Sequence, residues 1–176
     1  LSTDLYLASL PSMASDFAVS PAAVQQTLSL FVFGFGSAQL ISGPLSDRYG
    51  RRPVLIGGLA VYLLASLACA LAPALDWLVV ARFVQAIGCC TAVVVVRAVI
   101  RDAYSPAEGA RVLAKASSLL ALAPIFGPIL GGYLQVAFGW RAAFVALALA
   151  GLAVWVAALR RMKESNNQPN PDSMRL

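Results

Sequence analysis

Two ionisable side chains, Asp4 and Arg82, stand inside long apolar stretches of this sequence. A carboxyl group in a partly dry environment favours its neutral form, so it can bind a proton in one surrounding and release it in another. Arginine stays positively charged in proteins, so Arg82 cannot carry that proton but can bias its release from a nearby acid. We therefore regard Asp4 and Arg82 as candidates for binding and releasing a proton.

Among the other polar residues of the apolar stretches, Tyr6, Gln39 and Gln85 are candidates for lining a cavity. Gln85 follows Arg82 by three positions, and this spacing places two side chains on the same face of a helix. The pair would form a polar stripe facing a cavity. Tyr6 and Gln39 are candidates for lining the same cavity, and ordinary packing is the alternative interpretation for each of them.

The most polar run in the first hundred residues is GPLSDRYGRR, from Gly43 to Arg52. Glycine permits the positive φ of a tight turn, which suits Gly50, and the close approach of helices, which suits Gly43. Asp47 lies among arginines and can pair with a neighbouring helix end, which would hold the turn in one conformation. The alternative is that the arginines mark only the orientation of a loop.

The composition indicates which elements position these residues. Of the 176 residues, 60% are hydrophobic and 12% are charged, and the mean hydropathy is +0.78. A soluble domain carries about 25% charged residues, so this chain has too little polar surface to be one. Its net charge of +5 falls between apolar blocks, which argues for a membrane partner and against nucleic acid. The sequence predicts an all-α integral membrane protein.

Six apolar segments approach the roughly 20 residues that a membrane-spanning helix needs. They cover about 1–14, 22–45, 54–72, 77–99, 107–137 and 142–159. The first begins part-way through a helix, and prolines tilt or break the fifth. The last residues are rich in Asn, Pro and charge, as a linker is. The predicted domains are a six-helix bundle over 1–160 and a cytoplasmic segment over 161–176.

Basic and acidic residues alternate between these segments. The connections after the second and fourth segments and the tail are rich in basic residues: Arg48, Arg51, Arg52, Arg97, Arg101, Arg111, Lys115, Arg160, Arg161 and Lys163. The other connections contain Asp16, Asp76 and a single arginine, Arg141. Because Arg-rich loops face the cytoplasm, we expect loops two–three and four–five and the tail on that side.

The segments place the two ionisable residues at different depths. Asp4 lies about ten residues from the outer end of the first segment, near the middle of the bilayer at about 1.5 Å per residue. Arg82 lies about 7 Å inside the outer end of the fourth. A charge there costs about 2–3 kcal/mol and normally faces a bundle interior or a wet cavity. The alternatives are that Arg82 reaches the outer interface or a backbone carbonyl, and that Asp4 lies at an interface.

The run from Gly43 to Arg52 resembles the signature loop of the major facilitator superfamily of secondary transporters. That loop reads G-x-x-x-D-R-x-G-R-R and follows the second helix. Its positions are occupied by Gly43, Asp47, Arg48, Gly50, Arg51 and Arg52. In the family the loop stabilises the outward-open state and does not bind substrate. The resemblance implies that Asp47 is the latch residue, the residue whose pairing holds the turn, with Arg97 or Arg101 as its partner.

Two further motifs resemble those of proton-coupled members. LVVARFVQAIG is similar to the fourth-helix pattern L-x-x-x-R-x-x-Q-G, with Arg82 and Gln85 in place and Ala86 where glycine is expected. APIFGPILGG is similar to the fifth-helix motif G-x-x-x-G-P-x-x-G-G of exporters that exchange drug for proton, with Ala123 where glycine is usual. This fifth-helix motif contains Pro124, Gly127, Pro128, Gly131 and Gly132. Its prolines can bend the helix as a gate would, or serve plain packing.

The stretches STDLYLASLPSMA and VVRAVIRD resemble the bicyclomycin-resistance/chloramphenicol-efflux subgroup of drug:proton antiporters, which has proline where Ala8 stands. The resemblance implies the first six of twelve helices, built as a three-plus-three inverted repeat, with a missing C-terminal six-helix half. It also implies proton-coupled export of small, largely apolar drugs or metabolites across the bacterial inner membrane. The alternatives are an importer or uniporter of the same fold, and a half-transporter that binds partners without transport.

An enzyme within the membrane is the remaining class to consider. The sequence contains no histidine, and Cys69, Cys89 and Cys90 show no CxxC spacing. A zinc site or a disulfide framework is therefore not expected. A nucleophile with its base, or paired acids, is also lacking in the apolar segments. We predict that the chain is not an enzyme, binds no metal and needs no cofactor, with the proton as its coupling ion.

Overall fold

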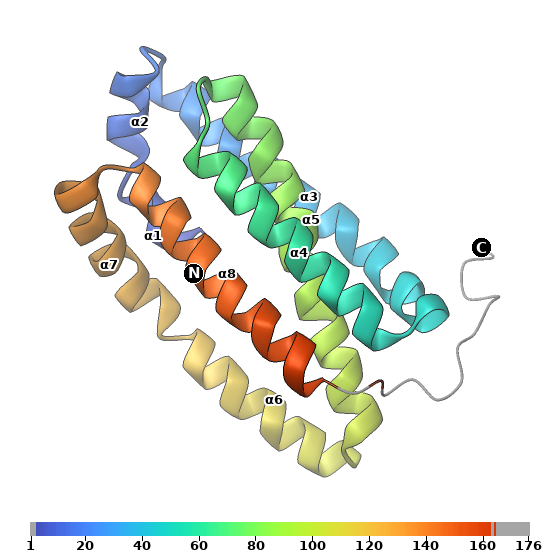
Figure 1. The fold of residues 1–176 in the computed structure, drawn as a ribbon. Helices are drawn as coiled ribbons and strands as arrows, with labels where there is room; N and C mark the ends of the chain where they lie inside the picture. The colour runs from blue at the N-terminus through green and yellow to red at the C-terminus, as the bar shows by residue number, and fades with distance from the viewer. Residues whose placement is uncertain (1–2, 163, 165–176) are drawn as a thin grey trace.

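The computed structural model of the chain describes residues 3–162 and 164, and these residues are almost entirely helical (Figure 1). The helices are α1 (Asp4–Leu7), α2 (Leu10–Asp16), α3 (Pro21–Tyr49), α4 (Arg51–Ala70), α5 (Leu75–Ala103), α6 (Pro106–Leu120), α7 (Ala123–Phe138) and α8 (Arg141–Arg161). This confirms the predicted all-α fold. Most of the predicted segment 161–176 lies outside the described residues.

Five stretches of the described chain are long and apolar enough to cross a membrane. They are α3, α4, α5, α6 together with α7, and α8. Two predicted segments are interrupted. The first consists of the short helices α1 and α2, separated at Ala8 and Ser9, and the fifth breaks between Leu120 and Ala123. The second break directly precedes Pro124, which occupies the first turn of α7, where its missing N–H costs nothing.

Side-chain caps fix where two of the long helices begin. Ser20 accepts a hydrogen bond from the amide of Ala23 at 3.3 Å, and Pro21 takes the first position of α3. At α6, Glu108 accepts a bond from the amide of Ser105 at 3.2 Å within a capping box. These contacts satisfy amides that have no partner inside the helix.

The polar run between the second and third spans is almost wholly helical, which its sequence did not indicate. Helix α3 continues to Tyr49 and α4 starts at Arg51, so the turn consists of Gly50 alone. Gly50 has φ of +96°, a conformation that side chains disfavour, as predicted for this position. Close helix packing at Gly43 is not seen among the described residues, because a Cβ placed there would meet no atom within 4 Å.

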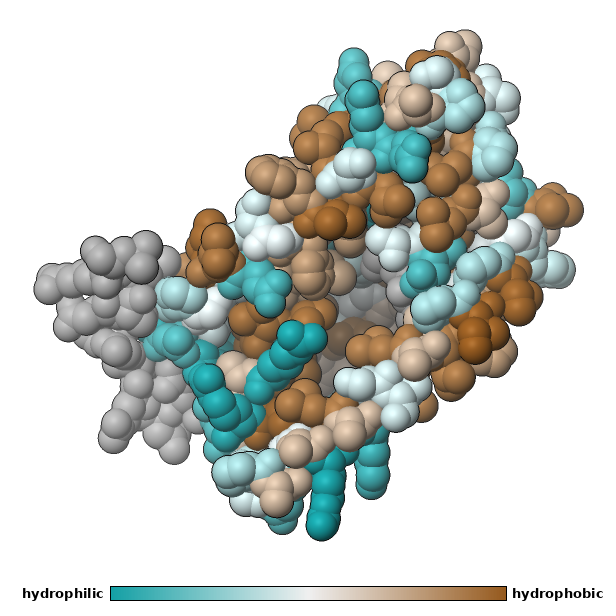
Figure 2. Space-filling view, turned by 180° about the vertical axis from the view of Figure 1, so that it is seen from behind, coloured by the Kyte–Doolittle hydropathy of each residue, from teal (hydrophilic) through white to brown (hydrophobic). Residues whose placement is uncertain are grey.

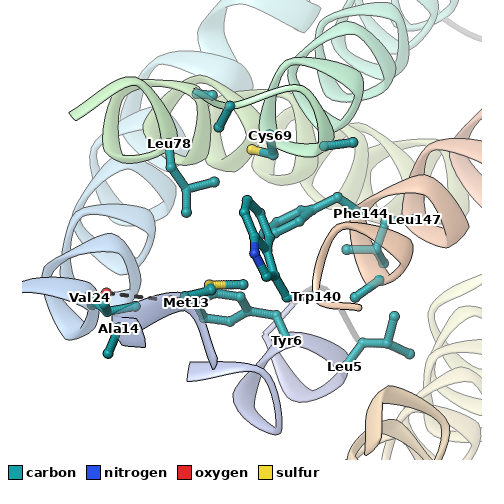
Figure 3. Packing of buried hydrophobic residues seen from close by; sticks show 14 residues of the cluster. Leu5, Tyr6, Met13, Ala14, Val24, Cys69, Leu78, Trp140, Phe144 and Leu147 are labelled. Carbon is teal, nitrogen blue, oxygen red and sulfur yellow. Dashed lines mark hydrogen bonds between the residues drawn. The ribbon is translucent and has the colours of Figure 1, made fainter. Parts of the chain in front are cut away.

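Helix α5 packs against α3 and α4, and α4 packs in turn against α8. Glycines allow this contact: a Cβ added at Gly88 of α5 would lie 2.5 Å from the backbone nitrogen of Tyr62 on α4. Two apolar clusters hold the bundle. The larger joins α1, α2, α3, α4, α5 and α8, and Figure 3 shows Tyr6, Met13, Trp140 and Phe144 converging within it.

Much of the surface is apolar. Large hydrophobic side chains such as Leu40, Val136 and Phe138 are more than 70% exposed, as expected where lipid replaces water. Figure 2 shows hydrophobic residues over much of one face, with hydrophilic side chains gathered at the lower end of that view and again at the upper end. The described chain is therefore built as a multi-pass membrane protein.

Candidate functional site

Arg82 lies inside the bundle within an aromatic enclosure, defined here as the rings of Tyr6, Phe31 and Phe144. Its side chain is fully buried. The guanidinium carbon is 4.6 Å from the ring centre of Tyr6, 4.3 Å from that of Phe31 and 5.8 Å from that of Phe144. Ring faces attract a cation, and a desolvated contact gains more than an exposed one. The alternative that Arg82 reaches the outer interface does not hold in this structure.

A line of hydrogen bonds continues from Arg82 into α4. Nη1 of Arg82 donates to Oε1 of Gln85 at 2.8 Å, and Nε2 of Gln85 donates to Oγ of Ser66 at 2.7 Å. The hydroxyl of Ser66 in turn donates to the carbonyl of Tyr62. Arg82 and Gln85 therefore share one helix face, as their spacing indicates. Both are buried, so this polar stripe connects helices within the described chain.

Tyr6 links α1 to α3. Its ring is fully buried, and its hydroxyl group contacts the hydroxyl of Thr27 and donates to the carbonyl of Val24 at 3.5 Å. The dashed line in Figure 3 marks the bond to Val24. Gln39, the other predicted cavity residue, lies on an exposed face of α3. The structure thus places Tyr6 beside Arg82 and leaves Gln39 on the surface.

Asp4 lies on α1 against the fifth-helix motif. A Cβ added at Gly127 of α7 would come within 2.5 Å of the Cβ of Asp4, and one added at Gly131 would overlap the carbonyl of Leu5. Gly132 faces open space. The two motif glycines therefore allow α1 and α7 to touch backbone to backbone. The predicted proton-binding acid and the predicted antiporter motif, far apart in sequence, are neighbours in the fold.

The turn at Gly50 is held by a buried arginine. Arg51 is 5% exposed. Its guanidinium forms ion pairs with Asp47 at 2.5 Å and with Asp102 at 3.0 Å, and it donates to Oγ of Ser46 at 2.6 Å. Asp102 lies near the end of α5, so Arg51 connects the α3–α4 turn to α5. A charge this deeply buried needs such partners, because losing one leaves it uncompensated.

A second acid reaches the turn from beyond α8. The carboxylate of Glu164 accepts hydrogen bonds from the backbone amides of Arg51 and Arg52, at 2.8 and 3.0 Å. The guanidinium of Arg52 also donates to the carbonyl of Leu159, at 3.4 Å. The first residues of α4 are therefore bonded to both α5 and the end of α8.

The other predicted residues of the turn have more peripheral places. Arg48 stacks on its neighbour Tyr49, at 5.3 Å from the ring centre. Nε of Arg101 lies 3.9 Å from Oδ1 of Asp102. Arg97 is exposed and lines a groove of about 260 Å³ between α5 and α6. Pairing of Asp47 with Arg97 or Arg101 stays a prediction.

The sequence interpretation missed Asp102 and Glu164. Asp102 carried a weak signal, since it directly follows Arg101 at the end of a predicted span. Glu164 carried none, because its partners are backbone amides more than a hundred positions away. Within residues 3–162 and 164, no group of three or more His, Cys, Asp or Glu side chains could hold a metal ion.

The sequence of the chain matches a known family over almost its whole length. The profile described as Major Facilitator Superfamily matches residues 1–175. The chain belongs to this family. Among similar proteins are the multidrug resistance protein MdtL of Escherichia coli (strain K12) and that of Shigella boydii serotype 18 (strain CDC 3083-94 / BS512). Each is 34% identical over 162 residues, which cover 92% of this chain and 41% of the relative.

A solved structure has a similar fold. The crystal structure of the human organic anion transporter MFSD10 (TETRAN) superimposes with a TM-score of 0.68 at 20% identity, which supports the fold alone. The match covers 96% of this chain and 40% of that one. The chain thus spans about two fifths of the length of the relatives it matches. This proportion fits the predicted N-terminal half of a twelve-helix fold.

Proposed function

We propose that this chain is the first half of a transporter that exports small, largely apolar compounds and takes up protons in exchange. Family membership and the similarity to MdtL, whose name describes multidrug resistance, support transport of small molecules. One observation supports the proton coupling. The short helix α1 carries Asp4, and two residues later it carries Tyr6, whose ring lies 4.6 Å from the guanidinium of Arg82.

The arrangement suggests how a proton would act on the bundle. Helix α1 packs against the motif glycines of α7 at Asp4 and against Arg82 and α3 at Tyr6. Neutralising Asp4 would change the charge carried by α1 while Arg82 stays positive. The preferred position of α1 would then differ between the protonated and deprotonated states, which is what coupling to alternating access requires.

We also propose the orientation of the chain in a bacterial inner membrane. The α3–α4 turn, the α5–α6 connection and the residues after α8 would face the cytoplasm, because these places carry most of the arginines. The resemblance to the bicyclomycin-resistance/chloramphenicol-efflux subgroup fits this location. In the twelve-helix protein, the C-terminal six helices would complete the cavity in which substrate binds.

The test uses the full-length transporter in proteoliposomes. Asp4→Asn should abolish uphill, proton-driven export and substrate-induced proton release, while substrate binding on the same preparation is retained. Asp76→Asn, which alters an exposed acid at the start of α5, serves as the matched control and should leave both measurements unchanged.

Three outcomes would reject the proposal. If the Asp4→Asn protein still pumps against a gradient with unchanged proton stoichiometry, the coupling group lies elsewhere. If substrate and protons move in the same direction in the unmodified protein, the transporter is an importer. Movement of substrate without protons would instead indicate a uniporter.

A further inference from the structure

Glu164 occupies an unusual position for an acid that follows the last span of the bundle. Its two carboxylate oxygens accept bonds from the first two backbone amides of α4, at 2.8 and 3.0 Å. Those amides have no acceptor inside their own helix, and a negative charge is favoured where they gather. An acid more than a hundred positions away in sequence therefore provides the cap of α4.

The turn residue leaves room for this acid. A Cβ added at Gly50 would lie 2.8 Å from Oε2 of Glu164 and 3.1 Å from its carboxyl carbon. Gly50 is glycine because of its φ of +96°, and the carboxylate of Glu164 packs directly against the face of Gly50 that has no side chain. The carboxylate therefore lies against the turn itself, next to the two amides that it caps.

The capped backbone belongs to the residue that joins the helices. Glu164 holds the amide of Arg51, and the side chain of Arg51 reaches Asp47 and Asp102. With its amide held and its guanidinium paired, Arg51 is bonded at both ends. The orientation of its Cα–Cβ bond depends on the first of these contacts, and the ion pair with Asp102 depends on that orientation.

We propose that Glu164 is a positioning residue for Arg51. Through the two amide bonds it keeps the start of α4 oriented so that Arg51 pairs with Asp102. The chain that leaves α8 is thereby coupled to the end of α5, although Glu164 itself bonds to α4. Displacing the segment after α8 would release Arg51 and loosen the end of α5. This coupling does not depend on which compound is transported or on which residue carries the proton.

Hydrogen exchange of backbone amides in the full-length protein tests this coupling. In Glu164→Ala, and in Glu164→Gln, whose amide group offers one acceptor oxygen instead of two, the amides of Arg51 and Arg52 should exchange about five-fold faster. This is the change that loss of a side-chain cap typically produces. Asp76→Asn is the control, since it removes an exposed acid at the start of α5, away from Glu164.

The decisive measurement lies at the end of α5. A cap with only a local role would speed exchange at the start of α4 and nowhere else. A positioning role predicts faster exchange also at Ala103 and Tyr104, next to Asp102, to the level seen in Asp102→Asn. The double variant Glu164→Ala/Asp102→Asn should then exchange no faster at Ala103 and Tyr104 than Asp102→Asn alone, because both changes break one connection.

Three results would overturn the proposal. Unchanged exchange at Arg51 and Arg52 would show that Glu164 does not cap α4. Faster exchange confined to those two amides would show a local cap without positioning. Additive effects of the Glu164 and Asp102 changes at Ala103 and Tyr104 would show that the two acids act separately.

Discussion

At the scale of single residues, Arg51 and Arg82, the two arginines buried among the described residues, have different surroundings. Arg51 pairs with the carboxylates of Asp47 and Asp102. Arg82 lies against three aromatic rings and donates to Gln85. Carboxylates attract any cation, whereas stacking between rings depends on the planar shape of the guanidinium. Substitution by lysine should therefore have different consequences at the two sites.

We expect Arg82→Lys to lower transport by about ten-fold, because lysine cannot stack on the rings of Tyr6 and Phe31 while donating to Gln85 in the same plane. Arg141→Lys is the matched control. Arg141 also lies over a ring, that of Trp140 at 4.3 Å, but its side chain is exposed. Initial rates of efflux at equal protein abundance provide the measurement. Equal rates for both variants would show that charge alone matters at Arg82.

Removing the acids that pair with Arg51 should impair transport to different extents. Asp47→Asn and Asp102→Asn each leave the arginine with one carboxylate. The side chain of Asp102 is 25% exposed and that of Asp47 is 40% exposed. Water can therefore solvate the unpaired guanidinium of Arg51 less well on the side of Asp102 than on the side of Asp47. We expect both variants to insert normally and to lose transport several-fold, with the greater loss in Asp102→Asn. Undiminished efflux in either variant would contradict its assigned role.

At the scale of elements, the contact between α1 and α7 depends on glycines that lie one helical turn apart. Gly127 and Gly131 face Asp4 and Leu5, whereas Gly132 faces open space. Gly127 and Gly131 are therefore needed for the close contact between α1 and α7, whereas Gly132 takes no part in that contact. Its two prolines also differ, since Pro124 starts α7 and Pro128 lies inside it.

Gly127→Ala should force α1 away from α7 and destabilise the protein by about 1–3 kcal/mol, the usual cost of overpacking a close contact. Gly132→Ala changes the same residue type in the same helix without meeting another atom, and we expect it to be neutral. Thermal unfolding of both purified variants in the same detergent compares them. Equal midpoint temperatures of unfolding for the two variants would mean that α1 and α7 are not in contact.

The sequence was informative about these elements wherever the signal was local. Apolar length located α3, α4, α5 and α8 to within a few residues, and prolines indicated the break in the fifth segment. The extent of α3 was underestimated, because the charges from Asp47 to Arg52 were interpreted as a loop. Arg51 is instead paired with Asp102 near the end of α5, and the backbone amide of Arg51 is bonded to Glu164 beyond α8. Such distant partners are not visible in a local pattern.

At the scale of the whole molecule, the charge asymmetry predicts which end faces the cytoplasm. Single cysteines placed beside Arg51 and Arg111 should react with an impermeant reagent only from the cytoplasmic side. A cysteine beside Asp76 should react only from outside. Cys69, Cys89 and Cys90 are free thiols and must first be replaced. Reversed accessibility at any of the three positions would overturn the orientation.

The surroundings of Arg82 could be predicted from the sequence only in part, because most of its neighbours lie on other helices. Arg82 and Gln85 were found because they lie three positions apart on one helix. The rings around Arg82 come from α1, α3 and α8, and apolar segments contain many aromatic residues with nothing to distinguish these three. Only the packed bundle shows which of them meet. The same holds for Asp4 and Gly127, which the fold brings together from distant parts of the chain.

The single-residue turn at Gly50 has a consequence for how this sequence can vary in length. One residue inserted between α3 and α4 would rotate α4 by about 100° about its axis. Val54, Leu55 and Leu59, which are buried, would then leave the core, and Arg51 would turn away from Asp102. Insertions and deletions should therefore be excluded here. Homologous chains should differ in length at other connections and keep this one at a single residue.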